Sequence, residues 1–283
     1  PTLNSYKDKF TYPVYIDYED KLLLANTASN AERTEILRTG MNALQSAGYL
    51  SGFYTYYNFA GNYIDTQQLM DEGYDFWVAH TSASTNPWTG ASVWQNSHTD
   101  TVAGISGNVD ANISYVDYDA LNTVITVYDQ NTSANVSGKM RDIVARIVAN
   151  EVGGGLGLTG LDRQQLYKAQ AVAAHSWLLF QRQRGSSYPS VGLGTVNEAI
   201  LCAANQVARF TVQYNGSVIN AAYTSCAGPY TNSAANMGWG SYAYLVPVAS
   251  QYDSAFAPGY YPKTSTISLE TMRQNIIKMV GTT

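Results

Sequence analysis

Charged side chains are scarce in this sequence. Lys, Arg, Asp and Glu make up 13% of the 283 residues, about half the share of roughly 25% that is usual in globular domains, and the net charge is −5. A negative chain with few cations is a poor partner for nucleic acid or for an anionic membrane surface. We therefore expect neither to be its main ligand.

Long hydrophobic runs are also absent. No apolar stretch approaches the roughly 18 residues of a membrane helix, and no signal peptide opens the chain. We expect no membrane span in this chain. Export, if it occurs, would be specified by residues absent from this sequence.

The residues that usually bind metals or form disulfides are few. His80, His98 and His175 are the three histidines and show no ligand spacing, so we expect no metal and no other cofactor. The two cysteines, Cys202 and Cys226, flank a predicted hairpin, and the sequence leaves three states open for them: a disulfide, two free thiols and, last, a metal site.

Tyrosine, with 23 residues, is abundant, as are Ser, Thr and Asn. Aromatic faces stack on sugar rings and short polar side chains bond to hydroxyls, so this composition is typical of extracellular proteins that handle carbohydrate, and also of secreted proteins that bind no glycan. The length fits one large or two medium domains. No Pro/Gly/Ser linker interrupts the chain, so we expect domains 1–119 and 120–283 to pack closely.

The segment 139–185 is the one around which the second domain is organised. Apolar residues at helical spacing predict a helix that carries Glu151 to its C-terminal end, where the helix dipole favours a protonated carboxyl, as a general acid requires. The stretch GGGLGLTG follows as a loop. A second helix is predicted to begin at Asp162, with Gln165 completing a capping box, and to end before Gly185. Its predicted inner stripe is Leu166, Gln170, Ala173, Trp177 and Phe180.

This order, with KAQAVAAHSW, Asn215-Gly216, TSCAGPYT and WGSYAYLVPV, resembles the catalytic domain of stage II sporulation protein D over residues 122–255. That family consists of peptidoglycan lytic transglycosylases. The resemblance implies that Glu151 is the catalytic acid and that Lys168 and His175 contact substrate, although His175 stands where the family usually has arginine. Some members bind zinc through a histidine and two cysteines, but the spacing here does not match. The implied fold is a mixed domain with a central two-helix core and β-hairpins.

The first part of the chain alternates strand and helix patterns, which predicts a parallel α/β sheet or barrel. Strands are expected in VYIDYED, GFYTYYNF, YDFWVAHTS, ASVWQNS and ISGNVDANISY, and an amphipathic helix in ASNAERTEILRTGMNALQSAGY has Ile36, Leu37, Met41 and Leu44 inward. Asp17 and Glu19 lie on one face of a strand, with Cα atoms about 6.5 to 7 Å apart, which suits paired acids at a glycosidic bond and equally a solvated acidic edge.

The same order of motifs is similar to the C-terminal part of family 25 glycoside hydrolases, the (β/α)-barrel lysozymes, over residues 12–118. The resemblance implies that Glu19 is the acid, Asp17 its partner and Asp110 a supporting carboxylate. Tyr54, Trp77, Trp94 and Gln95 would line the sugar site, although Trp77 and Trp94 serve equally well as core residues. A barrel takes about 200 to 250 residues, so we expect a partial barrel that is completed by a missing segment or a partner polypeptide.

Two functions therefore compete. The leading one is cleavage of peptidoglycan glycan strands, by a lytic transglycosylase with Glu151 as general acid joined to a muramidase-like domain, secreted or in the envelope of a Gram-positive bacterium. The alternative is a cell-wall-binding or scaffolding protein with degenerate enzyme domains. A third candidate, an amidase or peptidase, lacks the H-x-x-E-H or Cys-His signature. A final strand in YAYLVPVAS and a closing helix in SLETMRQNIIKMV, with Leu269, Met272, Ile276 and Met279 inward, complete the prediction.

Overall fold

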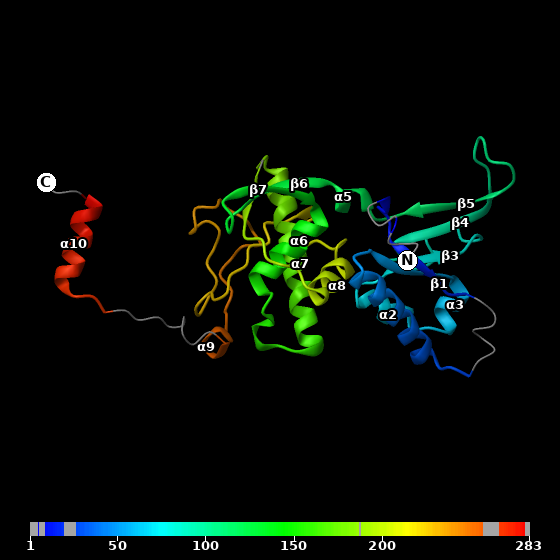
Figure 1. Cartoon of the computed structure of the whole chain (residues 1–283), viewed down its shortest axis with the longest axis horizontal. Coiled ribbons are helices and arrows are strands. Elements are labelled where there is room, and N and C mark those ends of the chain that lie inside the picture. The colour runs from blue at the N-terminus through cyan, green and yellow to red at the C-terminus, as the bar shows by residue number, and fades with distance from the viewer. Residues whose placement is uncertain (1–4, 6–8, 20–26, 187, 257–265, 281–283) are drawn as a thin grey trace. The chain divides into compact units, whose positions relative to one another are not determined.

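The computed structural model of this chain describes residues 5, 9–19, 27–186, 188–256 and 266–280. These residues belong to two compact units, 1–221 and 222–283, and each unit is described by itself (Figure 1).

The first unit opens with a five-stranded sheet whose strands follow chain order. The strands are β1 (Val14–Asp17), β2 (Ser51–Tyr56), β3 (Asp75–Ala79), β4 (Val93–Asp100) and β5 (Val109–Ser114). β1 to β4 pair in parallel, as the strand and helix alternation predicts. β5 is antiparallel to β4, which corrects the expectation of an all-parallel sheet. Only residues 101–108 join the two strands, and a parallel return would need a crossover of a dozen or more residues.

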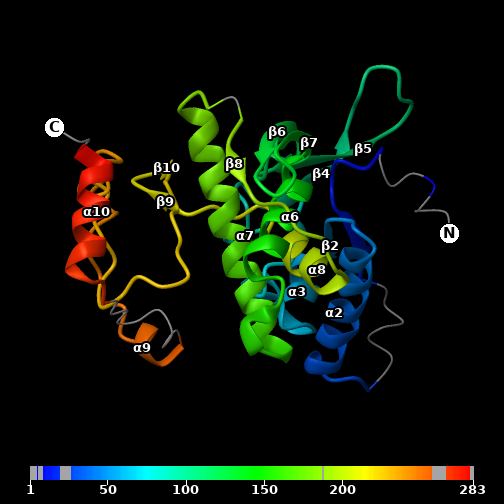
Figure 2. The ribbon, with the colours of Figure 1, turned by 60° about the vertical axis from the view of Figure 1, so that its left-hand side comes forward.

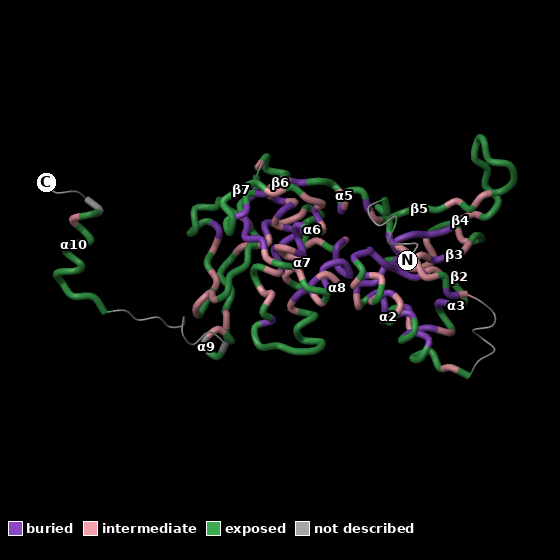
Figure 3. Tube along the Cα trace, in the orientation of Figure 1, coloured by how far each residue is buried: buried purple, intermediate pink, exposed green. Residues whose placement is uncertain are grey.

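Helices cover one face of this sheet. They are α2 (Asn30–Ser46), α3 (Tyr57–Asn62) and α4 (Thr66–Asp71). Ser29 and Glu32 form a reciprocal capping box at the start of α2, and Gly48 ends the turn after it with a φ of 88°. The residues that join helices and sheet include Leu37, Met41, Phe53 and Phe76, all completely buried. Figure 3 shows this buried layer in purple.

Two details of this layer differ from the sequence prediction. Ile36, predicted to face inward, is 56% exposed, because the buried face of α2 runs instead through Thr34, Leu37, Met41 and Gln45. The strand predicted in GFYTYYNF ends at Tyr56, and its last residues belong to α3, whose helical spacing directs Phe59 and Ala60 into the core.

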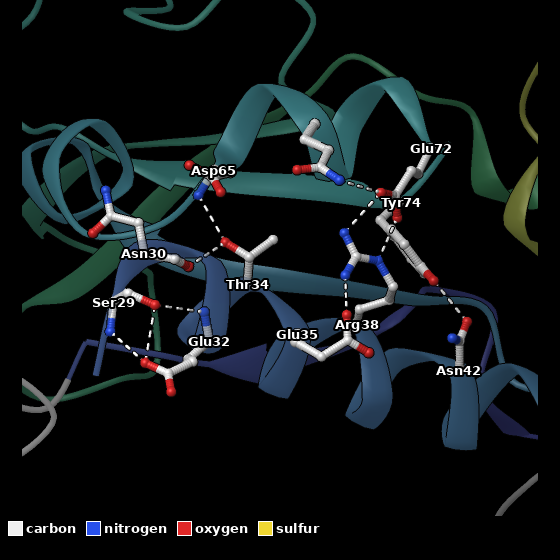
Figure 4. A network of polar contacts seen from close by, with 11 residues as sticks. Ser29, Asn30, Glu32, Thr34, Glu35, Arg38, Asn42, Asp65, Glu72 and Tyr74 are labelled. Atoms are coloured by element: carbon white, nitrogen blue, oxygen red, sulfur yellow. Dashed lines mark hydrogen bonds and ion pairs between the residues drawn. The ribbon is translucent and has the colours of Figure 1, made fainter. Parts of the chain in front are cut away.

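A polar network fixes α2 against the α4 region (Figure 4). The Arg38 guanidinium pairs with Glu35 on its own helix, and its Nε and Nη2 donate to the two carboxylate oxygens of Glu72 at 2.7 Å each. The Tyr74 hydroxyl donates to Asn42 Oδ1 at 2.6 Å. These bonds hold in place the turn from which β3 starts.

The opposite face of the sheet is covered at one end by the rest of the first unit. A small core joins Leu50 and Val93 of the sheet region to Tyr118 of α5 (Tyr118–Asn122) and to Ala208. Beside it lies a buried polar group on β3. Asp75 pairs with Arg209 and accepts a hydrogen bond from Ser92 Oγ at 2.8 Å. Residues far along the chain thus pack under the sheet.

The second half of the first unit has a helical core with a small sheet beside it. Its elements are β6 (Val124–Asp129), β7 (Ala134–Lys139), α6 (Met140–Val152), a 3-10 turn (Gly155–Gly157), α7 (Gly160–Gln183), β8 (Ser190–Val191), α8 (Glu198–Gln206), β9 (Gln213–Tyr214) and β10 (Ser217–Val218). The strands β7, β6 and β8 form one sheet in that order. The predicted pair of central helices is present as α6 and α7, and both also pack against α8 (Figure 2).

The turn and cap predictions in this half had mixed outcomes. β9 and β10 pair around Asn215 and Gly216, whose φ angles of 50° and 74° are those of the predicted type I′ turn. α7 begins at Gly160, and its N-cap Thr159 makes no side-chain cap bond, so the capping box at Asp162 is wrong. Of the predicted inner stripe of α7, Phe180 is buried and the other four residues are half-buried, because the most buried face lies mainly one residue further along. That face carries Tyr167, Lys168, Ala171, Ala174, His175 and Leu178.

Over residues 222–256 and 266–280, the second unit contains two helices, α9 (Asp253–Phe256) and α10 (Leu269–Val280). The strand predicted in YAYLVPVAS is not formed, apart from a single bridge between Tyr230 and Ala249. Within α10, Leu269, Met272 and Ile276 are 85%, 50% and 50% exposed, so the face predicted to point inward is open. The Met279 side chain lies outside the described part.

No helix in the described part of the chain is both long and apolar enough to cross a membrane.

Candidate functional site

A row of polar and aromatic side chains crosses the sheet on the face away from α2. Strand pairing aligns Asp17 at the end of β1 with Tyr54 on β2, and Tyr54 with Trp77 on β3. Residues opposite each other in paired strands share a face, so these three side chains lie on one surface. The row lies two residues beyond the Asp75 level, toward the C-terminal ends of the parallel strands.

Hydrogen bonds extend this row to β4 and β5. The Tyr54 hydroxyl donates to Gln95 Oε1 at 2.7 Å, and Trp77 Nε1 donates to Asn112 Oδ1 at 2.9 Å. The rings of Tyr54 and Trp77 meet edge to face, with centroids 4.9 Å apart. The two aromatic rings are therefore fixed in orientation by partners on the neighbouring strands.

Three carboxylates act on the Tyr54 hydroxyl. Burial raises the pKa of Tyr54 to about 12, and the negative charges of Glu19, Asp17 and Asp110 add to that rise. A charge affects a neighbour's ionisation in this way only when the two are close. The structure thus brings the three acids of the sequence prediction around one side chain, and their catalytic roles stay predictions.

Glu19 has the environment of a proton donor. Partial burial raises the pKa of its carboxyl, and the adjacent charge of Asp17 raises it further. A carboxyl with a raised pKa keeps its proton closer to neutral pH, as general acid catalysis of glycoside cleavage requires. Asp17 itself is exposed.

Trp94 does not belong to this surface, which corrects the sequence prediction. It is 5% exposed, packs in the core under the helices, and donates from Nε1 to the His80 carbonyl at 3.0 Å. Side chains alternate along β4, so Trp94 points away from the face that carries Gln95. Asn112 also belongs to this surface and was not predicted from the sequence, although its position two residues after Asp110 on one strand face could have indicated it.

Glu151 lies exposed in the last turn of α6. Asn150 Nδ2 donates to Glu151 Oε1 at 3.3 Å, and Asn131 Nδ2 donates to Asn150 Oδ1 at 2.8 Å. The Tyr167 hydroxyl donates to the Gly153 carbonyl at 3.1 Å and so joins α7 to the glycine-rich turn. The carboxylate is thus held at the position predicted from the sequence, and its role as an acid stays a prediction.

Lys168 and His175, expected to contact substrate, lie in the interior. They are 9% and 6% exposed, because α7 turns this face toward the neighbouring elements. Lys168 Nζ donates to the Glu72 carbonyl at 3.0 Å, and His175 Nδ1 lies 3.2 Å from the Phe210 carbonyl. Burial lowers the pKa of both side chains. Neither position fits a substrate-facing role, and we leave both residues out of the proposed site.

Both cysteines are free thiols in this structure. The Cys202 Sγ lies 3.4 Å from Gln45 Oε1, and burial raises the pKa of its thiol. Among the residues that the structure describes, no group of three or more His, Cys, Asp or Glu side chains is placed to hold a metal.

Comparisons with known proteins bear on the first part of the chain. Residues 2–105 match the family model described as glycosyl hydrolases family 25. Among solved structures, the modular autolysin LytC from Streptococcus pneumoniae is 21% identical, with a TM-score of 0.33, and the match covers 40% of this chain and 28% of that one. The CTP1L endolysin is 16% identical, with a TM-score of 0.30, and the match covers 49% of this chain and 48% of that one. The chain thus spans less than half the length of either protein.

No curated protein matches the chain. None of these comparisons supports the resemblance of residues 122–255 to sporulation protein D. What they do support is a lysozyme-like domain of glycosyl hydrolase family 25 over residues 2–105, with an α/β sheet that corresponds to part of a (β/α) barrel.

Proposed function

We propose that this chain hydrolyses the glycan strands of bacterial peptidoglycan at the surface around Glu19, as an N-acetylmuramidase of the cell envelope. The observation that carries the proposal is the clustering of three carboxylates around Tyr54, one of them with a raised pKa, in the segment that matches family 25. Cleavage of a glycosidic bond needs one protonated and one ionised carboxyl, and environments that separate their pKa values supply both.

In this proposal Glu19 protonates the oxygen of the leaving sugar. Asp17 lies beside it and positions the substrate's acetamide group or the attacking group, while Asp110 supports the site from β5. Trp77, fixed by Asn112, offers a ring edge or face to a sugar. Gln95 holds the Tyr54 hydroxyl on the same surface.

The test is a variant of the proposed acid. Glu19→Gln should lower hydrolysis of purified glycan strands by about 10²-fold or more, since loss of a general acid typically costs 10²–10⁴. Glu270→Gln, on the exposed face of α10, is the matched control and should retain the full rate. Full activity in Glu19→Gln would contradict the assignment of Glu19 as the acid.

A second activity is proposed for Glu151, as the acid of a lytic transglycosylase. The supporting observation is an exposed carboxylate held by Asn150 at a helix end beside a glycine-rich turn. The muramic acid 6-hydroxyl would attack its own anomeric carbon, so no second enzyme carboxylate is needed.

Mass spectrometry separates the two activities, because a hydrolysed strand carries one more water than an anhydro product. Glu19→Gln should remove the reducing product alone, and Glu151→Gln the anhydro product alone. Binding to cell walls without either product would support the scaffolding alternative.

A further inference from the structure

The second unit contains a pocket whose lining includes none of the acids of the two proposed activities. Its volume is about 880 Å³, within the usual range of roughly 300–1,000 Å³ for small-molecule sites. All the residues that line it belong to 222–253, so the pocket is complete within this unit.

The walls of this pocket are joined by backbone hydrogen bonds. Thr231 and Val248 share two hydrogen bonds. The Thr231 amide donates to the Val248 carbonyl at 2.8 Å, and the Val248 amide donates to Thr231 Oγ1 at 2.8 Å. The Ala234 amide donates to the Leu245 carbonyl at 3.1 Å. Two segments, 229–239 and 244–250, are thereby held side by side. A site whose walls are already fixed loses little entropy when a ligand binds.

The lining is aromatic and almost free of charge. Tyr230 and Trp239 are 61% and 47% exposed, and Tyr223 and Tyr244 join them in lining the pocket. Every residue of the lining is described by the structure, and Asp253 is the one charged residue among them. Its carboxylate is already hydrogen-bonded within the unit. It accepts from the Ala227 amide at 2.6 Å, and this bond lowers the pKa of Asp253. Neither a cation nor an anion would find a free counter-charge among these residues.

A neutral saccharide fits this lining. Flat aromatic side chains match the apolar faces of pyranose rings, and the hydroxyl oxygens of Thr224 and Ser250 can accept hydrogen bonds from sugar hydroxyls. Met237, Val246 and Val248 add exposed apolar surface that would suit the methyl group of an acetamido substituent.

We propose that the pocket between residues 222–227, 229–239 and 244–253 is a second glycan-binding site, which takes N-acetylated sugars. This inference rests on the proposed function, because peptidoglycan is the N-acetylated glycan that the chain would meet.

The experiment uses the full chain with Glu19→Gln and Glu151→Gln, so that the probe is not cut. The chain has five tryptophans, and 5-fluorotryptophan labelling gives each a fluorine NMR signal; Trp239→Phe identifies the signal of Trp239. Tetra-N-acetylchitotetraose should shift the Trp239 signal in a saturable way. Cellotetraose lacks the acetamido groups, and the affinity obtained from its titration should be at least tenfold lower. No movement of the Trp239 signal, or equal affinity for both probes, would overturn the proposal.

Matched variants locate the site. Tyr230→Ala should weaken the response of Trp239 at least tenfold, Tyr230→Phe should retain it, and Tyr214→Ala, which removes an exposed ring on the β9–β10 hairpin, should leave it unchanged. Equal affinity in Tyr230→Ala would contradict the site. Cleavage by the unmodified chain is measured separately. A Trp239 response without cleavage would refute only the proposed function, and cleavage without a response would refute only this inference.

Discussion

The charge of Asp17 sets how readily Glu19 gives up its proton. Burial comes first in raising the pKa of Glu19, and Asp17 second. Asp17→Asn should therefore lower this pKa, and any activity that needs protonated Glu19 should decline at a lower pH. Carbon-13 NMR titration of the Glu19 carboxyl measures the shift directly. Asp110→Asn is the control, because Asp110 raises the pKa of Tyr54 and is not among the causes of the raised pKa of Glu19. An unchanged titration in Asp17→Asn would refute the coupling.

Arg209 compensates the buried charge of Asp75. Their side chains are 11% and 9% exposed, and burial raises the pKa of Asp75 even with Arg209 beside it. Arg209→Met should cost about 3–5 kcal/mol of unfolding free energy at neutral pH, because it leaves an unpaired charge in the interior. A carboxyl whose pKa is higher in the folded state than in the unfolded state makes the protein less stable as the pH rises. The difference in unfolding free energy between Arg209→Met and the parent should therefore shrink toward acid pH, where Asp75 is protonated.

Urea unfolding of Arg209→Met and of the parent between pH 4 and 8 tests this expectation. Arg273→Met, from an exposed pair on α10, is the control and should change stability little. A deficit that stays constant across this pH range would show that the loss comes from packing alone.

Several single residues could be placed from the sequence and others could not. Asp17, Tyr54, Trp77 and Gln95 come together because strand alternation, which is visible in the sequence, sets their face. Trp94 could not be placed, because alternation separates the two faces of a strand without saying which one the helices cover. On α7, apolar residues on several sides allowed the buried face to be misplaced by one residue, and Lys168 was misplaced with it.

At the scale of elements, the segment before α8 passes tightly over the last turn of α6. A Cβ atom at Gly194 would lie 2.7 Å from the Asn150 backbone nitrogen, closer than real Cβ atoms approach. Gly194→Ala should therefore destabilise the fold by about 1–3 kcal/mol and displace the turn that carries Glu151. Gly61→Ala in α3, where a Cβ would meet nothing within 4 Å, is the control and should cost nothing. Thermal melts of both variants and of the parent measure the change in stability. A Gly194→Ala variant as stable as Gly61→Ala would mean that the backbone around residue 194 adjusts without cost.

Elements were predictable where a local signal exists. The five strands, α2 and the Asn215-Gly216 hairpin each have a periodic pattern or a turn pair in their own residues. The direction of β5 depends on the length of the connection from β4. The end of β2 depends on the packing of Phe59 in the core between helices and sheet, which is a tertiary contact. α8 was not predicted, and the core formed by α6, α7 and α8 is the reason for its burial.

At the scale of the whole molecule, the domain boundary expected after residue 119 crosses a shared core. Val93 packs with Tyr118 and Ala208, and Arg141 of α6 donates to the Gly48 carbonyl at 3.0 Å. We predict that residues 1–119 alone do not fold cooperatively, whereas residues 1–221 unfold in a single transition. Circular dichroism and tryptophan fluorescence during urea unfolding test this, and two separate transitions in 1–221 would contradict it.

The packing of Ala208 and Arg209 beneath the sheet also limits how this chain can be recombined with others. A crossover after residue 119 would separate Asp75 from its counter-ion and would remove Leu121 and Ala208 from the small core around Val93. A crossover after residue 221 would preserve both. The segment that can be exchanged between proteins with its core intact, residues 1–221, is therefore about twice as long as the segment that matches family 25, residues 2–105.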